Sequence, residues 1–213
     1  MIPKLHYISQ GSSQNDHIEN IQKACNAGAE LVQLRLKNIS EKRALLLAQE
    51  ARAITAHFQT RLIINDYYKV AREVKADGVH LGKNDTCPTL ARRHLYTWQI
   101  IGCTANTLQD CENLIEKEVD YISLGPLRFT ETKKNLPTIL GLAGYAAIVD
   151  VLKTETPILG VGGITLDDIT PLLATGISGI AVSGEITKDF NKIKSFNKLL
   201  GASSTKEQRH SFK

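Results

Sequence analysis

The sequence predicts an α/β fold, a single-domain (β/α)8 TIM barrel, from three observations. Short apolar runs with β propensity alternate with segments of helical periodicity about eight times along the chain. No two successive runs are joined by a hairpin turn, so we expect parallel strands connected by helical crossovers. The 213 residues leave little more than is needed for these units, which suits a compact barrel. A doubly wound open sheet is the alternative architecture.

Each expected strand is a short run of apolar residues bounded by turn-forming residues. The expected strands cover residues 5–9, 31–35, 61–64, 78–81, 100–102, 121–124, 157–160 and 179–182. We expect residues 1–200 to form one domain. Residues 201–213 are expected to form a polar, flexible tail, because a run of small and polar residues begins at Ala202.

The helices between these strands are indicated by apolar residues that recur at spacings of three and four. In the first helix Asp16 is a candidate N-cap, Ile18, Ile21 and Cys25 share one face, and Gly28 is a suitable stop. The faces of later helices comprise Leu47, Ala51, Ile54 and Phe58; Val70, Ala71 and Val74; Leu108, Cys111, Leu114 and Ile115; and Ile193, Phe196, Leu199 and Leu200. Further helices are expected over residues 90–95, 141–152 and 166–175.

The composition argues against several classes of function. The formal net charge is +4, and no basic stripe interleaved with aromatic residues occurs, so nucleic-acid binding is not expected. The four cysteines form no CxxC pair, and neither a secretory signal nor an apolar run of membrane-spanning length is present. We therefore expect a cytoplasmic protein with no membrane partner, and the composition is compatible with acidic small-molecule ligands. A homo-oligomer is compatible with the sequence.

Polar side chains gather at the end of the second expected strand. Gln33, Arg35 and Lys37 alternate along the chain, so an extended backbone places them on one side. An amide and two cations that face one way favour anion binding over a solvated surface. In a (β/α)8 barrel this end of the strands carries the chemistry.

Two carboxylates follow the next two strands. Asn65 and Asp66 end the third strand, and Asp85 follows the fourth. Taken singly, Asp66 is better explained as a helix N-cap and Asp85 as a loop residue that caps the next helix. Their joint position beside Arg35 and Lys37 favours Mg²⁺, which combines one or two protein carboxylates with water and substrate phosphate.

A second candidate anion site follows the seventh and eighth strands. Gly163 belongs to a glycine-rich turn, and Ser183 and Gly184 follow the last strand, so open backbone N–H groups are expected there. Backbone N–H groups suit a monophosphate. The loop after the sixth strand adds two hydroxyls and a cation, Thr130, Thr132 and Lys133.

Three further residues near strand ends have ordinary interpretations as well. Thr104 could donate to a phosphate. His80 lies inside a strand, and a structural histidine is favoured over a catalytic one. Cys103 is expected to pack in the core, because no flanking histidine or cation would activate it.

At these positions the sequence resembles the thiamine-phosphate synthase (thiamine-phosphate pyrophosphorylase) family. The family patterns Gln-Leu-Arg-x-Lys, Ile-Asn-Asp and Gly-Val-His-Leu-Gly-x-x-Asp correspond to residues 33–37, 64–66 and 78–85. Gly-Pro-x-x-x-Thr-x-Thr-Lys corresponds to residues 125–133, and Gly-Gly-Ile to residues 162–164. The resemblance covers nearly the whole chain before the tail.

The resemblance implies a transferase that joins 4-amino-2-methyl-5-hydroxymethylpyrimidine diphosphate to 4-methyl-5-(2-hydroxyethyl)thiazole phosphate, giving thiamine phosphate and diphosphate. By position, the resemblance implies that the pyrimidine diphosphate is held by Gln33, Arg35, Lys37 and Asn65, and that Mg²⁺ is bound by Asp66 and Asp85. It implies that the thiazole phosphate is contacted by Thr130, Thr132, Gly163, Ser183 and Gly184. Thr104 stands where the family usually has serine. Arg35, Lys37 and Lys133 would stabilise the departing diphosphate while the thiazole nitrogen captures the pyrimidine cation.

The sequence departs from the family pattern at several points. Lys83-Asn84 replaces Gln-Glu, residues 104–106 replace a Ser-Thr-His segment, Phe129 replaces proline, and Ser183-Gly184 replaces Ile-Ser. These changes leave the metal and diphosphate residues intact and affect the thiazole side.

Three other functions compete with the synthase. A thiazole tautomerase paralogue would not need Asp66, Asp85 and Lys37 together. A non-catalytic thiamine-phosphate-binding regulator could keep every ligand. An unrelated sugar-phosphate isomerase barrel is disfavoured by the carboxylate pair.

Overall fold

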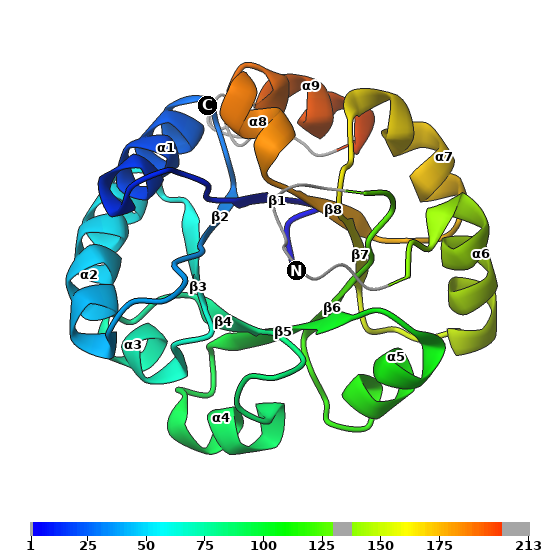
Figure 1. Ribbon diagram of the computed structural model, residues 1–213, viewed down its shortest axis with the longest axis horizontal. Helices are drawn as coiled ribbons and strands as arrows, with labels where there is room; N and C mark the ends of the chain where they lie inside the picture. Colours follow the sequence, from blue (N-terminus) through cyan, green and yellow to red (C-terminus); the bar gives the residue numbers. More distant parts are fainter. Residues whose placement is uncertain (1, 130–137, 202–213) are drawn as a thin grey trace, which may run out of the picture.

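The computed structural model describes residues 2–129 and 138–201, in which eight parallel strands close into a barrel (Figure 1). The strands are β1 (Leu5–Ile8), β2 (Leu31–Leu34), β3 (Arg61–Asn65), β4 (Gly78–Leu81), β5 (Ile100–Ala105), β6 (Tyr121–Leu124), β7 (Ile158–Val161) and β8 (Gly179–Val182). Strands β1 and β8 pair in register, Tyr7 opposite Val182, and so close the sheet. The predicted barrel is confirmed and the open sheet is excluded.

Helices surround the barrel in a single outer layer (Figure 1). They are α1 (Gln14–Asn26), α2 (Glu41–Phe58), α3 (Tyr68–Glu73), α4 (Pro88–His94), α5 (Leu108–Ile115), α6 (Gly141–Leu152), α7 (Ile169–Ala174), preceded by a 3-10 turn η1 (Leu166–Asp168), α8 (Gly184–Lys188) and α9 (Lys192–Leu199). The apolar face expected for the first helix is buried, as Ile21 and Cys25 show. In the last helix Ile193 and Phe196 are buried, whereas Leu199, which was expected on the same face, is exposed. Among the described residues, no helix combines the length and apolarity needed to cross a bilayer.

Two expectations about helix ends are wrong. The N-cap of α1 is Ser13, and Asp16 lies at the third helical position, where its carboxylate completes a capping box. The segment after β8 forms a short helix, α8, before α9, where only one closing helix was expected. A five-residue helix is too short to leave a periodic apolar pattern, and only Ile186 of α8 is buried.

The barrel interior is filled by aromatic and polar rings. The ring of Tyr121 lies 4.9 Å from that of His6 and 5.7 Å from that of His80, although their strands are not neighbours in the sheet. These contacts must therefore cross the interior. Gly102 makes room for the tyrosine, because a Cβ at this position would stand 1.9 Å from Cζ of Tyr121.

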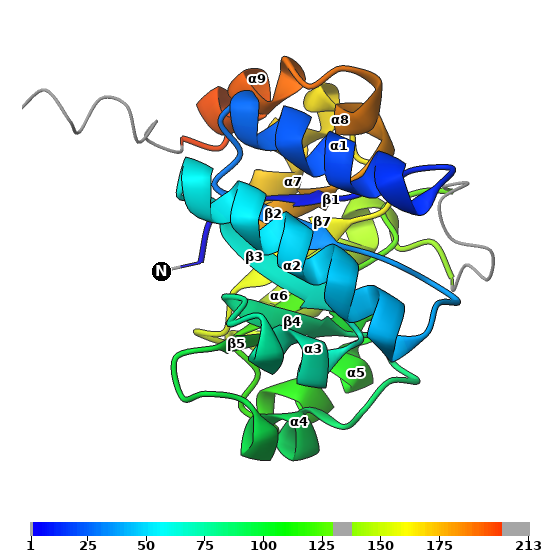
Figure 2. The ribbon, with the colours of Figure 1, turned by 90° about the vertical axis from the view of Figure 1, so that its left-hand side faces the viewer.

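The two ends of the barrel differ in what they carry. Figure 2 shows the N-terminal segment at one end and the loops that follow β1 and β2 at the other. Among the described residues, the predicted site residues outside the strands lie in the segments that follow them: Arg35, Lys37, Asp66, Asp85, Gly163 and Ser183 in loops, and Gly184 at the start of α8. Residues 202–213 of the expected tail lie outside the described residues.

Candidate active site

A cavity of about 700 Å³ opens at the carboxyl ends of the strands. This volume suits a small-molecule site. All eight strands or the loops after them contribute to its lining, which consists of Ile8, Gln10, Gln33, Arg35, Lys37, Asn65, Asp66, His80, Gly82, Thr104, Asn106, Ser123, Gly125, Pro126, Val161, Gly162, Gly163, Ile164, Thr165, Ala181, Val182, Ser183, Gly184, Glu185 and Lys188. The predicted residues Gln33, Arg35, Lys37, Asn65, Asp66, Thr104, Gly163, Ser183 and Gly184 are therefore brought together.

The end of β2 supplies the cations. Gln33 is the buried penultimate residue of β2, and Arg35 and Lys37 follow the strand. Burial lowers the pKa of Arg35, and the charge of Asp66 opposes this shift. Lys37 forms an ion pair with Asp66. Two cations thus face one wall of the cavity, as the alternation in the sequence predicts.

Asp66 and Asp85 form the carboxylate pair. Burial, followed by a hydrogen bond with Asp85, raises the pKa of Asp66 to about 6. Asp85 is outside the cavity lining, but its Oδ2 accepts the Gly82 N–H at 2.6 Å. Although burial acts in the opposite direction, the hydrogen bonds from Asp66 and Gly82 lower the pKa of Asp85. One shared proton or one cation would relieve the repulsion between these two groups.

The pair fits a divalent cation. Oδ1 of Asp66 is buried and accepts no hydrogen bond from the described residues. Asp66 also adopts a left-handed backbone conformation, with φ of 66°, which is strained for a residue other than glycine. The described residues contain no group of three or more His, Cys, Asp or Glu side chains that could hold a metal. Two carboxylates with open positions for water and phosphate are typical of Mg²⁺ rather than of a closed protein cage.

On the opposite wall, the loop after β7 exposes backbone. Gly162 and Gly163 have φ of 97° and 71°, a conformation that strongly favours glycine. A Cβ on Gly163 would stand 2.5 Å from Cγ of Arg128 and 3.0 Å from the carbonyl oxygen of Phe129. Both reasons restrict the position to glycine, so the turn can present its N–H groups to a ligand.

Arg128 fixes this glycine turn from the β6 side. Its guanidinium donates to both carboxylate oxygens of Asp168, and its Nη1 also donates to the Gly163 carbonyl at 3.2 Å. Asp168 in turn accepts the Thr165 N–H at 2.8 Å. The charge of Arg128 is therefore used to join two loops. This pair joins residues 40 positions apart, and no local sequence signal predicts it.

His80 is the hub of a short polar chain. Its Nδ1 lies 3.1 Å from the Tyr121 hydroxyl, and its Nε2 lies 3.0 Å from Oγ1 of Thr104. The structure agrees with a histidine that is held by its neighbours, but His80 also lines the cavity. Thr104 is half-buried at the end of β5, with its hydroxyl bonded to this ring. Cys103 faces the core, and burial raises its thiol pKa to about 12, which disfavours a nucleophilic role.

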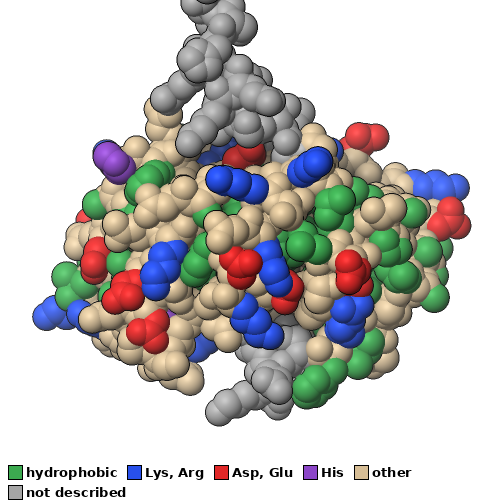
Figure 3. Space-filling view, turned by 90° about the horizontal axis from the view of Figure 1, so that it is seen from above, with side chains coloured by type: hydrophobic (Ala, Val, Ile, Leu, Met, Phe, Trp, Pro, Cys, Tyr) green, Lys and Arg blue, Asp and Glu red, His purple; other side chains and the backbone are tan. Residues whose placement is uncertain are grey.

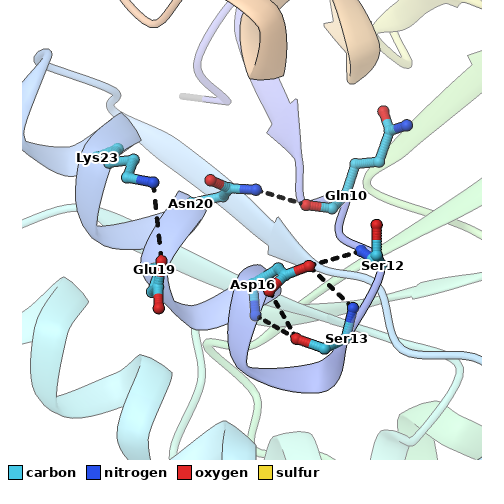
Figure 4. Close-up of polar contacts among 7 residues, drawn as sticks. All are labelled: Gln10, Ser12, Ser13, Asp16, Glu19, Asn20 and Lys23. Atoms are coloured by element: carbon cyan, nitrogen blue, oxygen red, sulfur yellow. Dashed lines mark hydrogen bonds and ion pairs between the residues drawn. The ribbon is translucent and has the colours of Figure 1, made fainter.

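Hydrogen bonds hold the loop after β1 against helix α1 (Figure 4). The N–H groups of Ser12 and Ser13 donate to Oδ2 of Asp16 at 2.8 and 2.9 Å. Nδ2 of Asn20 donates to the Gln10 carbonyl at 2.7 Å. Figure 4 shows the Gln10 side chain pointing away from this network. The Gln10 side chain instead contacts the residue that follows β8: the Ser183 hydroxyl donates to Oε1 of Gln10 at 3.4 Å.

A smaller cavity of about 500 Å³ adjoins the first between the loops after β1 and β2. The two cavities share Gln10, Arg35 and Lys37. The Ser9 hydroxyl accepts the Arg35 N–H at 3.0 Å and contacts Nδ1 of His17 at 2.8 Å. This network fixes the backbone from which the Arg35 side chain projects.

Gln10 and Lys188 are among the cavity residues that were not predicted. Gln10 comes two residues after β1, so the rule that selected other strand ends would have found it. Lys188 is reached through α8, the helix that the sequence pattern does not reveal. Conversely, the predicted Thr130, Thr132 and Lys133 lie outside the described residues.

One outer face of the molecule carries charges of both signs. Figure 3 shows a face of the molecule on which acidic and basic side chains are interleaved.

Comparison with known proteins gives a consistent result. Residues 5–186 match the thiamine monophosphate synthase family. The thiamine-phosphate synthase of Flavobacterium johnsoniae is 46% identical over 195 residues, covering 90% of this chain and 92% of that protein. The corresponding protein of Flavobacterium psychrophilum is 39% identical, covering 93% and 98%.

Solved structures include the thiamine phosphate pyrophosphorylase of Pyrococcus furiosus. It is 26% identical and superposes with a TM-score of 0.76, covering 93% of this chain and 95% of that one. The family match extends from β1 into α8 and so spans every strand that lines the cavity. The chain belongs to the thiamine-phosphate synthase family.

Proposed function

We propose that the cavity joins 4-amino-2-methyl-5-hydroxymethylpyrimidine diphosphate to 4-methyl-5-(2-hydroxyethyl)thiazole phosphate, giving thiamine phosphate and diphosphate. The family match and the sequence identity to thiamine-phosphate synthases show that the chain is a transferase of this class. The observation that carries the site assignment is one cavity with cations and a carboxylate pair on one wall and a glycine turn on the other. These walls match the two differently phosphorylated substrates.

The pyrimidine diphosphate binds at the wall formed by β2 and β3. Arg35 and Lys37 provide charge for the diphosphate, and Gln33 and Asn65 provide amides for hydrogen bonds. Nδ2 of Asn65 is buried without a hydrogen-bond partner among the described residues, which supports a ligand contact there. Asp66 and Asp85 would hold Mg²⁺, which when bound neutralises charge on the diphosphate oxygens.

The thiazole phosphate binds at the opposite wall. Gly163 and the backbone after β8, at Ser183 and Gly184, offer N–H groups to its phosphate, and the half-buried Thr104 lies at the floor between the walls. In the same proposal, the hydroxyl groups of Thr130 and Thr132 donate hydrogen bonds to this phosphate. Substrates held on facing walls place the thiazole nitrogen near the pyrimidine methylene carbon, which supplies the advantage of proximity.

The reaction breaks the bond between the methylene carbon and the diphosphate oxygen. The electron pair leaves with the diphosphate, whose growing charge Arg35, Lys37 and Lys133 stabilise. The aminopyrimidine delocalises the resulting cation, and the thiazole nitrogen lone pair forms the new C–N bond. No enzyme nucleophile is required, in agreement with the buried thiol of Cys103 and the bonded ring of His80.

A direct assay tests this proposal. Purified protein is mixed with both substrates and Mg²⁺, and thiamine phosphate and diphosphate are quantified. Equal amounts of the two products are expected, and chelation of Mg²⁺ by EDTA should stop the reaction until excess Mg²⁺ is added. Binding of both substrates without product would overturn the catalytic assignment in favour of a non-catalytic binder.

A further inference from the structure

The wall formed by β7 and β8 has few charges of its own. Among the described residues that line the cavity, the lysines and arginines are Arg35, Lys37 and Lys188. The first two lie beside the carboxylates of β3 and β4, and Lys37 is paired with Asp66. Lys188 is therefore the described cation that lines the cavity outside this cluster.

Lys188 belongs to the short helix α8 that follows β8. It is the last residue of α8 and lies four positions after Gly184, so both residues are on the same face of the helix. Its side chain is exposed and makes no hydrogen bond or ion pair with the other described residues. The ammonium group is thus available to a ligand.

The neighbouring acid does not neutralise Lys188. Glu185 also lines the cavity, but its carboxylate forms an ion pair with Lys192 of α9. The hydrogen bond to Glu185 raises the pKa of Lys192 and keeps that partner charged. The charges of Glu185 and Lys192 balance each other, so Lys188 contributes an unbalanced positive charge among the described residues that line this wall.

Among the described residues that line this wall, the other hydrogen-bond donors are neutral. The Ser183 hydroxyl is turned toward Oε1 of Gln10, and Gly184 has no side chain. A Cβ at Gly184 would approach the same Gln10 oxygen at 3.3 Å, so a larger residue would crowd this corner. A phosphate ester carries about −1.5 to −2 charges at neutral pH and gains from a cationic donor in addition to backbone N–H groups.

We infer that the Lys188 ammonium binds the phosphate group of thiazole phosphate and makes the cavity select the phosphate ester over the corresponding alcohol. This inference rests on the proposed function, because it takes the wall of β7 and β8 as the thiazole-phosphate side. Lys188 is then a specificity-determining residue that acts on substrate binding. It is not required for departure of the diphosphate.

The test measures binding of two probes by calorimetry: thiazole phosphate and the unphosphorylated 4-methyl-5-(2-hydroxyethyl)thiazole. Lys188→Gln should weaken binding of the phosphate about tenfold, as expected for a solvent-accessible contact between charges, and change binding of the alcohol less than about twofold. Lys188→Arg keeps the charge and should retain most of the affinity. Lys194→Gln is the matched control, because Lys194 is an exposed lysine on α9 outside the cavity lining.

Three results would overturn the inference. These are an unchanged affinity of Lys188→Gln for the phosphate, an equal loss for the alcohol, and an equal loss in Lys194→Gln, which would indicate a long-range field. In steady-state assays, KM for thiazole phosphate should rise while kcat and KM for the pyrimidine diphosphate stay constant. A rise in KM for the diphosphate substrate instead would also overturn it.

The binding measurement separates this inference from the proposed function. Wild-type protein that binds thiazole phosphate but forms no thiamine phosphate would contradict the catalytic proposal and leave the Lys188 comparison valid. An active wild type whose phosphate affinity does not depend on Lys188 would support the catalytic proposal and contradict the inference.

Discussion

At the scale of single residues, Asp66 combines several costly features. It has a left-handed φ, a buried carboxylate oxygen without a hydrogen-bond donor among the described residues, and a second carboxylate, Asp85, in contact. Burial and repulsion between the carboxylates disfavour the charge of Asp66, and the ion pair with Lys37 offsets only part of this cost, since the pKa of Asp66 is still raised. Such residues persist where a ligand repays their cost.

Replacing Asp66 and Asp85 together by alanine should therefore abolish turnover. We expect kcat/KM to fall on the order of a hundredfold or more, since charge on the leaving diphosphate is no longer neutralised. Binding of thiazole phosphate should remain measurable by calorimetry, because that substrate is assigned to the opposite wall. Loss of both properties in a folded double variant would mean that the metal site is misplaced.

His6 is a second residue with a distinctive environment. It is fully buried in the barrel, and desolvation, followed by repulsion from His80, lowers its pKa to about 3. The Pro3 carbonyl offsets part of this shift, although neither ring nitrogen makes a hydrogen bond of good geometry with the described residues. In the unfolded chain histidine titrates near pH 6.5. The unfolded state therefore takes up a proton below that pH, while the native state stays neutral.

This difference predicts acid sensitivity with a defined sign. The contribution of His6 to the free energy of unfolding is fully present above about pH 6.5 and is lost as the pH falls toward 3, by up to about 1.4 kcal/mol per pH unit. The slope of unfolding free energy against pH, measured by urea denaturation between pH 7.5 and 5, should be shallower for His6→Asn than for wild type. His57→Asn, at an exposed position of α2, should keep the wild-type slope. Equal slopes in all three proteins would contradict the assignment.

At the scale of elements, the site depends on contacts between loops that follow different strands. Arg128 after β6 holds the carbonyl of Gly163 and the carboxylate of Asp168 after β7. The sequence predicts the glycine turn, because Gly-Gly after an apolar run has a recognisable pattern. It does not predict the guanidinium that fixes the turn, because that contact exists only after the barrel has closed.

Asp168→Asn tests the contribution of this loop contact. The variant keeps the shape of the side chain but loses the charge, which should cost about 1 kcal/mol in unfolding free energy because Arg128 is half-exposed. KM for thiazole phosphate should rise severalfold as the glycine turn loosens. Asp120→Asn is the control, since Asp120 pairs with Arg92 and precedes β6 at the other end of the barrel. It should lose stability with no change in KM; equal KM changes in both would show a general effect of destabilisation.

Gly102 in β5 tests the packing of the barrel interior. In Gly102→Ala the new methyl group would overlap the ring of Tyr121, so we expect a loss of about 3 kcal/mol in unfolding free energy. Tyr121→Leu should relieve the overlap, and the double variant should lose less stability than the two single losses combined, by about 1 kcal/mol or more. Urea denaturation of the four proteins measures this coupling. Strict additivity would show that the ring moves aside freely.

At the scale of the whole molecule, the periodicity of the sequence predicts the barrel because each strand and helix buries a face that its own spacing reveals. Because the chemistry of a (β/α)8 barrel lies at the carboxyl ends of its strands, polar residues just after the strands are predicted site residues. This rule predicts Arg35, Asp66 and Gly163, which the closed barrel brings to one cavity. The same rule cannot reveal Lys188, which depends on a helix too short to show a pattern. A cytoplasmic location and a homo-oligomer stay predictions.

The boundary of the domain is the last property that the sequence predicts at this scale. The barrel is sealed next to its final helix: Ile193 and Phe196 of α9 are fully buried, and the Lys4 ammonium donates to the Leu200 carbonyl at 3.1 Å. Removal of residues 202–213 should therefore change the unfolding free energy by less than about 0.5 kcal/mol and leave the rate of thiamine phosphate formation unchanged.

Truncation after Phe190 provides the contrast, because it removes α9, with its buried Ile193 and Phe196, and exposes the surface of α7 and α8 that α9 contacts. The truncated chain lacks the buried side chains of Ile193, Phe196 and Leu200. Burial of each such side chain contributes about 1.5–3 kcal/mol, and a typical domain has a free energy of unfolding of only about 5–15 kcal/mol, so cooperative unfolding should be lost altogether. Circular dichroism during thermal unfolding, together with the product assay, distinguishes the two truncations. If the shorter cut at residue 201 also abolished folding or turnover, the barrel would not end at α9, and the terminal segment would be part of the catalytic domain.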